Sequence, residues 1–350
     1  MEQIVYAIKK VSKRYNLTIE ESMNIMKDIM NGKVKSSQLG AFLVAMAMKG
    51  ETVDELIGFA RIMRKYAKNI NPSVKNVLVD TCGTGGDKIK TFNISTITAF
   101  VIAGAGIYVA KHGNRAVTSK CGSADLLEGL GVNINLSPER VKECIENVGI
   151  GFMFAPLFHP AMKHAMPIRQ ELKIRTVFNI LGPLTNPAGA KCHVLGVFDK
   201  SLLSLMAKAL GEGLGGKHVF TVHNSSGIDE LAPVGINYLS EYHDNSLENY
   251  AITNEDFGIP SCVIEDLHVP SREDHFKIAV NILKNRLVGA KHNTILMNSA
   301  LALKSSGLVN DFVEGIEIAS QSIETGRAYE KLEQLIEFSE GNIARLKQYN

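Results

Sequence analysis

A glycine-rich run between two predicted elements is the first feature whose residues suit a chemical function. The sequence DTCGTGGD occupies positions 80–87, and TFNIST follows at 91–96. The run lies after a predicted strand and before a predicted helix, where backbone N–H groups of a tight turn and a helix N-terminus can surround an anion. The spacing is neither G-x-G-x-x-G nor G-K-S/T, which excludes a dinucleotide fingerprint and a Walker loop. We expect a phosphate site; the alternative is a strand-to-helix connection that binds nothing.

A second polar run follows another predicted strand. It reads KHGNR at 111–115 and continues with TSKCGS at 118–123. Ligands of parallel α/β sheets bind at the carboxyl ends of the strands. Two cations, an imidazole, an amide and several hydroxyls in such a place suit a phosphate or pyrophosphate. The alternative is a solvated basic loop, and the position after a buried strand favours the anion site.

An acidic pair, Asp229 and Glu230, lies just beyond the predicted strand at 219–222. Adjacent carboxylates on a loop can hold Mg²⁺, which prefers few carboxylates together with waters and substrate phosphates. An Asp-Glu pair taken alone is usually a surface feature. Its place beyond a strand end is what indicates a metal site.

A fourth group combines apolar walls with one cation. Ala155, Pro156 and His159 precede Arg169, and the run GPLTNP follows at 182–187. Such a set suits a small planar carboxylate, held by the guanidinium between apolar surfaces. The alternatives are a capping or core role for His159 and a surface ion pair for Arg169.

Since neither G-x-S-x-G nor H-E-x-x-H occurs, the chemistry indicated is binding of an anionic group with Mg²⁺ beside an aromatic or acidic molecule.

The elements that must position these residues fall into two patterns. The first ~70 residues are predicted helices, with capping boxes at Thr18/Glu21 and Thr52/Glu55. The run at 39–48 is apolar almost all round, so we expect it to be buried or covered by a partner chain. Beyond residue 76, short apolar runs at 77–79, 107–110, 150–154, 194–198 and 219–222 alternate with predicted helices at 95–104, 125–130, 138–147 and 202–214.

This alternation predicts parallel strands joined by crossover helices, hence an α/β fold with a mainly parallel central sheet. The section at 164–185 breaks the rhythm, and we expect it to pack back onto the N-terminal helices. The part from 291 to 350 is predicted to be mostly helical.

Composition excludes several classes of protein. The 350 residues carry 38 Lys and Arg against 36 Asp and Glu, a net charge of +2, which argues against a partner nucleic acid bound by bulk charge. The five cysteines are widely spaced without a C-x-x-C pair, so we expect reduced thiols and a cytoplasmic location. No signal peptide or membrane span is expected.

Twenty of the 30 glycines lie between Gly83 and Gly235. This concentration is expected if the loops in that region bring bare backbone close to a ligand.

Taken together, these motifs resemble the anthranilate phosphoribosyltransferases. The resemblance rests on GTGGD at 83–87, TFNIST at 91–96, KHGNR at 111–115 and NILGPLTNP at 179–187, and it covers essentially the whole chain. It implies a nucleoside phosphorylase/phosphoribosyltransferase-like fold, with a small all-helical domain at 1–73 plus roughly 166–188 and a large α/β domain at 74–165 and 189–350. It also implies a homodimer formed through the helical domain.

The resemblance further implies Mg²⁺-dependent transfer of the phosphoribosyl group of phosphoribosyl pyrophosphate to the amine of anthranilate, in tryptophan biosynthesis. The implied catalytic residues are Lys111, His112, Asn114 and Arg169. Those implied to bind phosphoribosyl pyrophosphate are Gly83, Gly86, Asp87, Thr91, Asn93, Ile94, Ser95, Thr96, Lys111, His112, Gly113, Asn114, Arg115, Ser119 and Ser123. Those implied to meet anthranilate are Gly83, Asn114, Ala155, Pro156, His159, Arg169 and Gly182. Two Mg²⁺ ions per subunit are implied, held by Ser95, Asp229 and Glu230.

No motif position departs clearly from the family pattern. Two stretches beside the motifs are less typical: KIK at 88–90 is a basic version of a variable stretch, and we expect HNSSG at 223–227 to differ in loop length from the commonest pattern. Both bear on the metal geometry and not on the assignment. One rival function is that of a pyrimidine nucleoside phosphorylase, which would use free phosphate and a nucleoside. The other is a non-catalytic relative that binds nucleic acid, which would require a damaged KHGNR motif and a basic surface.

Overall fold

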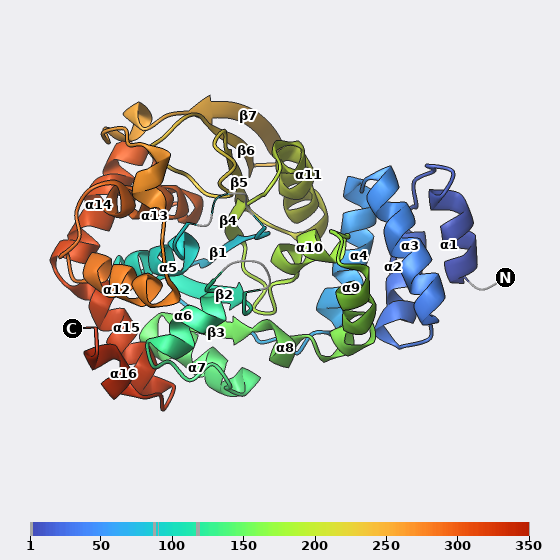
Figure 1. The fold of residues 1–350 in the computed structure, drawn as a ribbon, viewed down its shortest axis with the longest axis horizontal. Coiled ribbons are helices and arrows are strands. Elements are labelled where there is room, and N and C mark those ends of the chain that lie inside the picture. The colour runs from blue at the N-terminus through green and yellow to red at the C-terminus, as the bar shows by residue number, and fades with distance from the viewer. Residues whose placement is uncertain (1–2, 87–88, 90, 117–119, 350) are drawn as a thin grey trace.

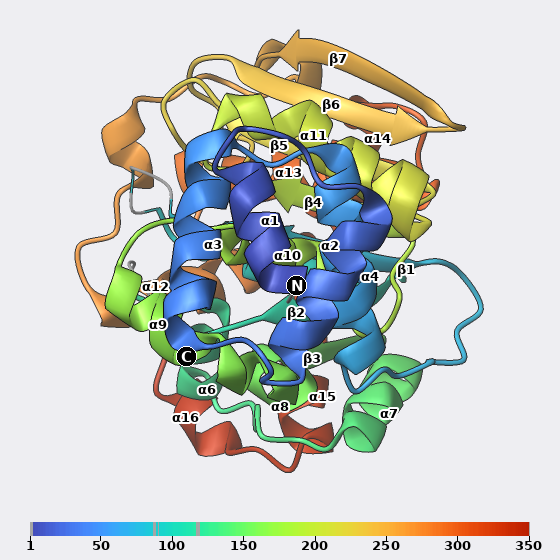
Figure 2. The same ribbon diagram turned by 90° about the vertical axis from the view of Figure 1, so that its right-hand side faces the viewer.

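The computed structural model describes residues 3–86, 89, 91–116 and 120–349. A bundle of four helices lies at one end of the molecule, and a sheet with its covering helices forms the larger part (Figure 1). The bundle comprises α1 (Gln3–Val11), α2 (Ile19–Met30), α3 (Ser36–Lys49) and α4 (Val53–Tyr66). Seen from the bundle's side, these helices lie in front of the sheet and of α10 (Phe178–Leu181) (Figure 2).

Both predicted capping boxes are confirmed. Thr18 and Glu21 exchange hydrogen bonds at the start of α2, and Thr52 and Glu55 do so at the start of α4. The Glu55 carboxylate is fully buried and also accepts from the Nζ of Lys49 at 2.8 Å. A buried ion pair of this kind ties the end of α3 to the start of α4, and losing one partner would leave an uncompensated charge.

The sheet has seven strands in the order β3-β2-β1-β4-β5-β6-β7. Strands β1 to β5 run parallel, as predicted, whereas β6 and β7 form an antiparallel hairpin at the edge. The bounds are β1 (Leu78–Gly83), β2 (Tyr108–Gly113), β3 (Ile150–Phe154), β4 (Cys192–Gly196), β5 (His218–Asn224), β6 (Asn237–His243) and β7 (Ser246–Ile252). The hairpin was missed by the sequence prediction. Its turn residues Asp244 and Asn245 both have positive φ, at 50° and 61°, the signature of a tight two-residue hairpin turn.

Alternate residues of the central strands β1, β4 and β5 face two different cores, whereas the second face of β2 and β3 adds Ala110 and Met153 to a third, smaller cluster. Val79, Val109 and Phe220 belong to a cluster with α5 (Ile94–Gly104) and the C-terminal helices. Leu195 and Val219 point the other way and pack with the helical bundle and α11 (Leu203–Lys208). The sheet is therefore covered on both faces, as parallel sheets require.

The remaining helices lie around this sheet. The predicted helix at 202–214 is divided into a 3₁₀ turn at Lys200–Leu202, α11 and a π-helical turn at Ala209–Gly213. The C-terminal part is helical, as predicted. The bounds are α6 (Ser123–Gly129), α7 (Pro138–Val148), α8 (Ala155–Phe158), α9 (Met166–Leu172), α12 (Arg272–Leu283), α13 (Ala290–Ser306), α14 (Phe312–Glu324), α15 (Arg327–Phe338) and α16 (Ile343–Lys347).

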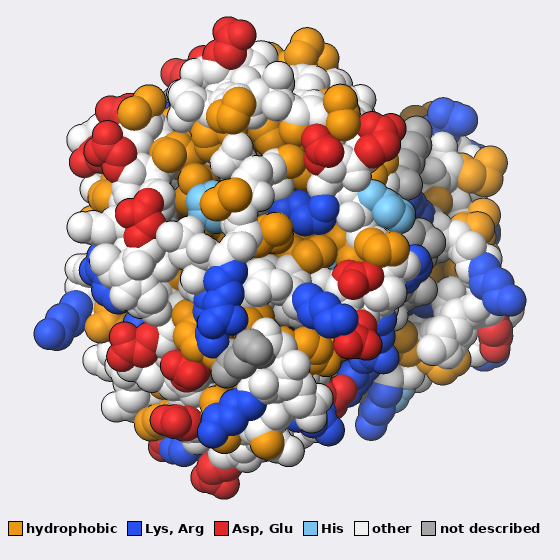
Figure 3. Space-filling view, turned by 60° about the vertical axis from the view of Figure 1, so that its left-hand side comes forward, with side chains coloured by type: hydrophobic (Ala, Val, Ile, Leu, Met, Phe, Trp, Pro, Cys, Tyr) orange, Lys and Arg blue, Asp and Glu red, His pale blue; other side chains and the backbone are white. Residues whose placement is uncertain are grey.

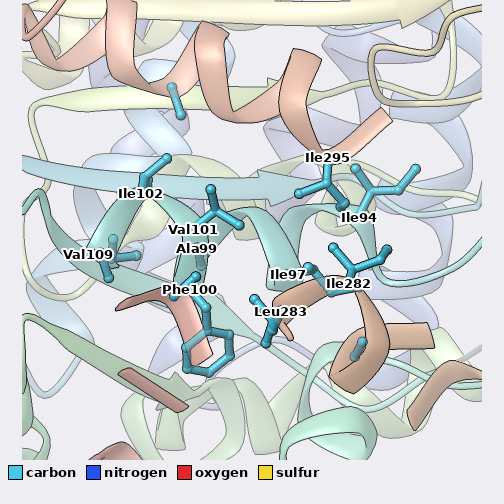
Figure 4. Close-up of a cluster of buried hydrophobic side chains, with 14 of the residues drawn as sticks. Ile94, Ile97, Ala99, Phe100, Val101, Ile102, Val109, Ile282, Leu283 and Ile295 are labelled. Carbon is cyan, nitrogen blue, oxygen red and sulfur yellow. The ribbon is translucent and has the colours of Figure 1, made fainter. Parts of the chain in front are cut away.

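Helix α5 is apolar on all sides and lies inside the larger core. Ile97, Phe100 and Val101 are buried, and Ile282, Leu283 and Ile295 of α12 and α13 surround the helix (Figure 4). A helix held this firmly fixes the place of its own N-terminus. That N-terminus follows the glycine-rich run.

The section that breaks the strand-helix rhythm packs against the bundle, as expected. Helix α9 contacts α3, while α10 and the 3₁₀ turn Gly182–Thr185 contact α4. Arg64 of α4 donates through Nε to the carbonyl of Leu184 at 2.7 Å and through Nη1 to that of Leu214 at 2.9 Å. We therefore propose the domain division 1–73 with about 166–188, against 74–165 with 189–350.

Charges of both signs alternate over the face in Figure 3, with hydrophobic side chains between them. Any anion recognition on that face therefore depends on local groups and not on a field of one sign. Within the described residues, no helix combines the length and apolar character needed to cross a membrane.

Candidate active site

The polar loops meet where the sheet changes direction. The chain runs from β1 outward through β2 to β3 and then returns to β4 on the other side of β1. The carboxyl ends of β1 and β4 therefore flank the switch point at which α/β sheets bind ligands. The N–H of Thr84, directly after β1, donates to the carbonyl of Gly196 at 2.9 Å. Gly85 and Gly86 follow with φ of +66° and +81°, which only glycine adopts readily.

Both carboxylates of the acidic pair reach this crevice. Oδ2 of Asp229 accepts from the N–H of Gly85 at 3.2 Å, and Oε1 of Glu230 accepts from the N–H of Ser95 at 2.9 Å. A Cβ on Gly196 would lie 1.6 Å from the carbonyl oxygen of Asp229. The close approach of the two backbones at Gly196 thus lets the acidic loop lie over the end of β4. The acidic pair and the glycine-rich loop, which the family resemblance assigns to one site, are thus adjacent in the structure.

The donor set suits a hard divalent cation. A cavity of about 10 Å³ is lined by Thr81, Ser95, Asp229 and Glu230 among others, and burial raises the pKa of Asp229, so a bound cation would favour its ionised form. No cluster of three or more His, Cys, Asp or Glu that could cage a metal occurs in the described part of the chain. Two acids and a hydroxyl, with substrate oxygens completing the shell, fit Mg²⁺.

Lys111 lies at the base of the crevice. Its ammonium is buried and donates to the carbonyl of Thr81 at 2.6 Å and to the Oγ of Ser95 at 3.3 Å. Burial lowers the pKa of Lys111, while the charges of Asp80 and Glu230 act in the opposite direction. The lysine thus contacts the hydroxyl of the same residue, Ser95, whose backbone N–H bonds to Glu230.

Asp80 is a residue of this site to which the sequence interpretation gave no role. It is fully buried and accepts from the Nδ2 of Asn186 at 2.7 Å and the backbone N–H of His112 at 3.4 Å. Burial raises its pKa to about 6, although Asn186 and Lys111 favour the ionised form. A carboxylate in an apolar strand directly after Val79 was the signal that could have revealed it.

His112 and His159 form a buried pair. Their ring centroids are 5.0 Å apart, and both Nε2 atoms lack a hydrogen-bond partner among the described residues. Burial lowers the pKa of His112 to about 3 and that of His159 to about 4. Both imidazoles are therefore neutral at pH 7, and each offers one ring nitrogen to a ligand.

Arg169 on α9 is the cation of the apolar group. In the described residues its contacts are the sulfur of Met166, 3.6 Å from Nη1, and the ring of Phe178, 5.4 Å from Cζ. No carboxylate of the described chain forms an ion pair with it. The described residues therefore do not form the surface ion pair that was the alternative role for Arg169. The guanidinium is free to donate hydrogen bonds to a ligand carboxylate.

Several predicted residues make contacts within the protein. Arg115 forms ion pairs with Asp125 at 3.1 Å and Glu128 at 2.7 Å, so its guanidinium is used by α6. The Nδ2 of Asn93 donates to the carbonyl of Cys121 at 2.9 Å, and its Oδ1 lies 2.7 Å from Nδ1 of His275.

The other predicted residues are distributed along the same edge. Ser123 donates to the carbonyl of Asn114 at 3.2 Å. Ala155 and Pro156 begin α8 after β3, and a Cβ on Gly182 would meet open space. The side chains of Ile94 and Thr96 are buried in α5, which leaves backbone atoms for any contact. Asp87 and Ser119 lie outside the described residues.

Comparisons with known proteins agree with this geometry. Residues 5–67 match a family described as a glycosyl transferase family, helical bundle domain, and residues 75–329 match its a/b domain. An anthranilate phosphoribosyltransferase of Desulfosudis oleivorans is 47% identical over 335 residues, which is 96% of this chain and 98% of the relative.

The chain belongs to the anthranilate phosphoribosyltransferases.

Solved structures of this family have the same fold. The anthranilate phosphoribosyltransferase of Thermus thermophilus is 40% identical with a TM-score of 0.90, covering 95% of this chain and 99% of that one. That of Saccharomyces cerevisiae, in complex with PRPP and Mg, is 26% identical with a TM-score of 0.88, covering 96% of this chain and 98% of that one. The yeast protein has also been solved in complex with 4-fluoroanthranilate, at a TM-score of 0.86 and the same identity and coverage.

The neutral histidine pair predicts how stability depends on pH. Folded-state pKa values of about 3 and about 4 lie below the ordinary value, so unfolding takes up protons at acidic pH. The contribution of the two neutral histidines to the free energy of unfolding is complete above about pH 6.5 and is lost as the pH falls toward 4. Each histidine loses up to about 1.4 kcal/mol for each pH unit. Replacing His159 with Gln should reduce the number of protons taken up on unfolding by one and so flatten the dependence of the unfolding free energy on pH. Urea unfolding between pH 7.5 and 5 measures this dependence.

The wild-type protein is the reference at every pH. Asp80, whose folded pKa of about 6 lies above its ordinary value, contributes stability that is lost as pH rises through 6. Because Asp80 is present in both proteins, its contribution cancels in the difference. Equal slopes for the two proteins would show that His159 binds a proton as readily in the folded state as in the unfolded state.

Proposed function

We propose that the chain transfers the 5-phosphoribosyl group of phosphoribosyl pyrophosphate to the amine of anthranilate, giving N-(5-phosphoribosyl)anthranilate and pyrophosphate in tryptophan biosynthesis. The observation that carries this is the meeting of Asp229 and Glu230 with the amides of Gly85 and Ser95 beside Lys111. Two carboxylates bonded to backbone amides, with an ammonium bonded to the hydroxyl of Ser95, suit a metal-bound pyrophosphate. Family membership and the yeast complexes support the same substrates.

We assign the phosphoribosyl pyrophosphate site to the loops after β1 and β2. The amides after β1 and at the start of α5 supply directed donors, and Lys111 supplies a charge without being able to move far, since it is buried. The proposed residues are Gly83, Gly86, Asp87, Thr91, Asn93, Ile94, Ser95, Thr96, Lys111, His112, Gly113, Asn114, Arg115, Ser119 and Ser123. For Arg115 we expect contact through the backbone, because its guanidinium is paired with Asp125 and Glu128.

We assign two Mg²⁺ ions per subunit to Ser95, Asp229 and Glu230. Bound Mg²⁺ would neutralise charge on the leaving pyrophosphate. The acidic pair would hold the cation through oxygen ligands, and the amides that these carboxylates now occupy would become available to phosphate oxygens.

We assign anthranilate to the segment from β3 to the turn at Gly182–Thr185. Arg169 would hold its carboxylate, while Ala155, Pro156, Gly83 and Gly182 would line its approach. Asn114, His112 and His159 would orient the amine, because the two imidazoles are neutral and can accept its protons in hydrogen bonds.

The reaction then needs positioning more than acid-base catalysis. An aromatic amine is uncharged at pH 7, so its lone pair attacks C1 of the ribose as the bond from C1 to the pyrophosphate oxygen breaks. The surplus amine proton passes to solvent. Lys111 stabilises the charge that develops on the leaving group, and Arg169 holds the acceptor in line.

Loss of anthranilate fluorescence, on mixing the protein with phosphoribosyl pyrophosphate, anthranilate and Mg²⁺, tests this function. We expect turnover that requires all three. Phosphorolysis of uridine or thymidine without that turnover would favour the pyrimidine nucleoside phosphorylase. Tight, salt-sensitive DNA binding without transfer would favour the nucleic-acid-binding relative.

We further propose a cytoplasmic homodimer formed through the helical domain. Helix α3 buries Leu39, Phe42, Leu43 and Met46 on its inner face, yet its outer face is also apolar, with Met48 70% exposed. A groove of about 390 Å³ between α1 and α3 is lined by Val11, Gly40, Ala41, Val44, Ala45 and Met48 among others. A second copy of this chain would cover that face. The five cysteines are free thiols, which supports a reducing location.

Arg169→Ala should raise the KM for anthranilate by about 10- to 100-fold, because a charge-assisted hydrogen bond to the carboxylate is lost. The KM for phosphoribosyl pyrophosphate should change less than about twofold. Steady-state kinetics with each substrate varied in turn measures both. Lys163→Ala removes an exposed positive charge from the preceding turn and is the matched control. Equal effects of Arg169→Ala on both substrates would contradict the carboxylate role.

Asp229→Asn combined with Glu230→Gln should raise the Mg²⁺ concentration for half-maximal activity by at least about tenfold, since two oxygen ligands lose their charge. Titration of activity with Mg²⁺ measures this, and calorimetry with phosphoribosyl pyrophosphate present counts the ions. Asp244→Asn with Glu248→Gln, two exposed acids of the β6–β7 hairpin, is the matched control. An unchanged metal dependence would remove the pair from the site.

Met48→Asp should convert the dimer to a monomer, because it buries a charge in the apolar contact. Size-exclusion chromatography with light scattering measures the mass. Val313→Asp, 51% exposed on α14 in the wild type, should remain dimeric. A wild-type protein that is monomeric at micromolar concentration, or a dimer that withstands Met48→Asp, would overturn this interface.

A further inference from the structure

We infer that Arg175 is a positioning residue that fixes the glycine-rich loop and thereby sets the affinity for phosphoribosyl pyrophosphate. This inference rests on the proposed function, because it assigns a role in binding the same substrate. Arg175 lies between α9 and α10, 89 positions from its contact in the glycine-rich loop. No feature of its local sequence indicated this role.

The guanidinium of Arg175 has two partners from separate loops. Its Nη2 donates to the carbonyl of Gly86, and its Cζ lies 3.9 Å from the ring centroid of Phe198, which follows β4. A Cβ on Gly86 would lie 2.9 Å from the same Nη2. The arginine therefore fills the space that the missing side chain of Gly86 leaves, and it stacks on an aromatic ring while donating.

Phe198 is itself fastened to the loop that Arg175 holds. Its N–H donates to the Oγ1 of Thr84 at 3.1 Å. The N–H of Thr84 bonds to Gly196, and that of Gly85 bonds to Asp229. Thr84 and Gly85 are thus anchored from the sheet and the acidic loop, whereas Gly86 is anchored from the opposite side by Arg175. Together these contacts fix the peptide planes of a loop whose left-handed glycines would otherwise sample many conformations.

The origin of Arg175 makes this anchor a link between the two substrate sites. Arg169 on α9, proposed to hold anthranilate, lies six positions before it in the same segment. The segment packs on α3 and α4 of the bundle, whereas Gly86 belongs to the α/β domain. Arg175 therefore joins the helical domain to the loop that receives pyrophosphate, and it leaves the chemical step to other groups.

Arginine is required by this geometry. A planar guanidinium can donate in its plane and stack through its face at the same time, whereas an ammonium is a compact charge without that face. A lysine at 175 would keep the positive charge but lose the simultaneous bridge. Charge and geometry can thus be separated by experiment.

The test compares Arg175→Ala, Arg175→Lys, Phe198→Leu and the double variant Arg175→Ala/Phe198→Leu with the wild type. Calorimetry gives the Kd of phosphoribosyl pyrophosphate with Mg²⁺, and kinetics gives kcat and both KM values. Arg175→Ala should weaken binding about tenfold and raise the KM for phosphoribosyl pyrophosphate equally, with kcat and the KM for anthranilate within about twofold. Arg175→Lys should remain about fivefold weaker than the wild type.

The double variant should bind no more weakly than Arg175→Ala, because the ring acts through the guanidinium. Arg286→Ala removes an exposed arginine elsewhere and should bind as the wild type does. Thermal unfolding checks that each variant folds. An unchanged Kd in Arg175→Ala, full recovery in Arg175→Lys or additive losses in the double variant would overturn the inference.

The binding measurement separates this inference from the proposed function. If the wild type bound phosphoribosyl pyrophosphate without consuming anthranilate, the proposed function would fail while the calorimetric series still decided the role of Arg175. If the wild type were active and Arg175→Ala bound normally, the Arg175 inference alone would fail.

Discussion

The buried carboxylate of Asp80 is the group on which the site's arrangement depends. It lies inside the sheet and accepts hydrogen bonds from the backbone of β2 and from Asn186, whose Nδ2 also donates to the carbonyl of Ala110 at 2.8 Å. Three segments distant in sequence are thereby joined at one point. Its charge also opposes the desolvation of Lys111 and favours the ionised form of that lysine. The charge of the lysine therefore depends in part on a residue that need not touch substrate.

From this point the site extends in two directions. Toward the β1–β4 crevice, Lys111 contacts Ser95, and the acidic pair closes over the same turn. Toward the bundle, His112 packs against His159, and the rings of both are associated with the backbone of the Gly182–Thr185 turn. That turn is bonded to Arg64 of α4. The two proposed substrate sites thus share adjacent residues of a single strand, β2, so their separation is fixed by the strand itself.

Much of this could be predicted from the sequence because it is local. The capping boxes at Thr18 and Thr52 involve residues three apart, and the strand-end motifs follow from periodicity and turn chemistry. Parallel strands place their carboxyl ends at one edge, which predicted anion sites in the loops that follow the strands; the family resemblance assigned Gly83, Lys111 and Asp229 to one site. Apolar patterning predicted that the helix at 39–48 is covered, and the break in the alternation of strands and helices predicted that 164–185 packs on the bundle.

The parts that were not predicted depend on contacts between distant residues. The ion pairs of Arg115 with Asp125 and Glu128 require α6 to begin at Ser123 and turn its acids back toward the loop. The contact of His275 with Asn93 joins positions 182 apart, and nothing in the sequence near either residue indicates it. The β6–β7 hairpin was missed because its strands are largely polar and were not read as an alternating pattern around Asp244 and Asn245. Local sequence rules predict which loops meet. They do not predict which side chains of those loops are already paired with other residues of the protein.

The two glycines beside Asp229 and Ser123 differ in how much change the site tolerates. At Gly113 an added Cβ would meet the Oγ of Ser123 at 2.2 Å and the Cε2 of the buried Phe152 ring at 2.8 Å, so the hydroxyl would have to rotate away and the ring would have to shift. At Gly196 it would meet the backbone of Asp229 at 1.6 Å, which can yield only if the whole acidic loop moves. In a library of random substitutions selected for activity, we therefore expect small residues at Gly113 in variants of reduced stability. At Gly196 we expect only glycine, unless further substitutions rebuild the acidic loop. Gly196 at the end of β4 is therefore the position of the two that constrains the evolution of the active site more strongly, although it contributes no functional group.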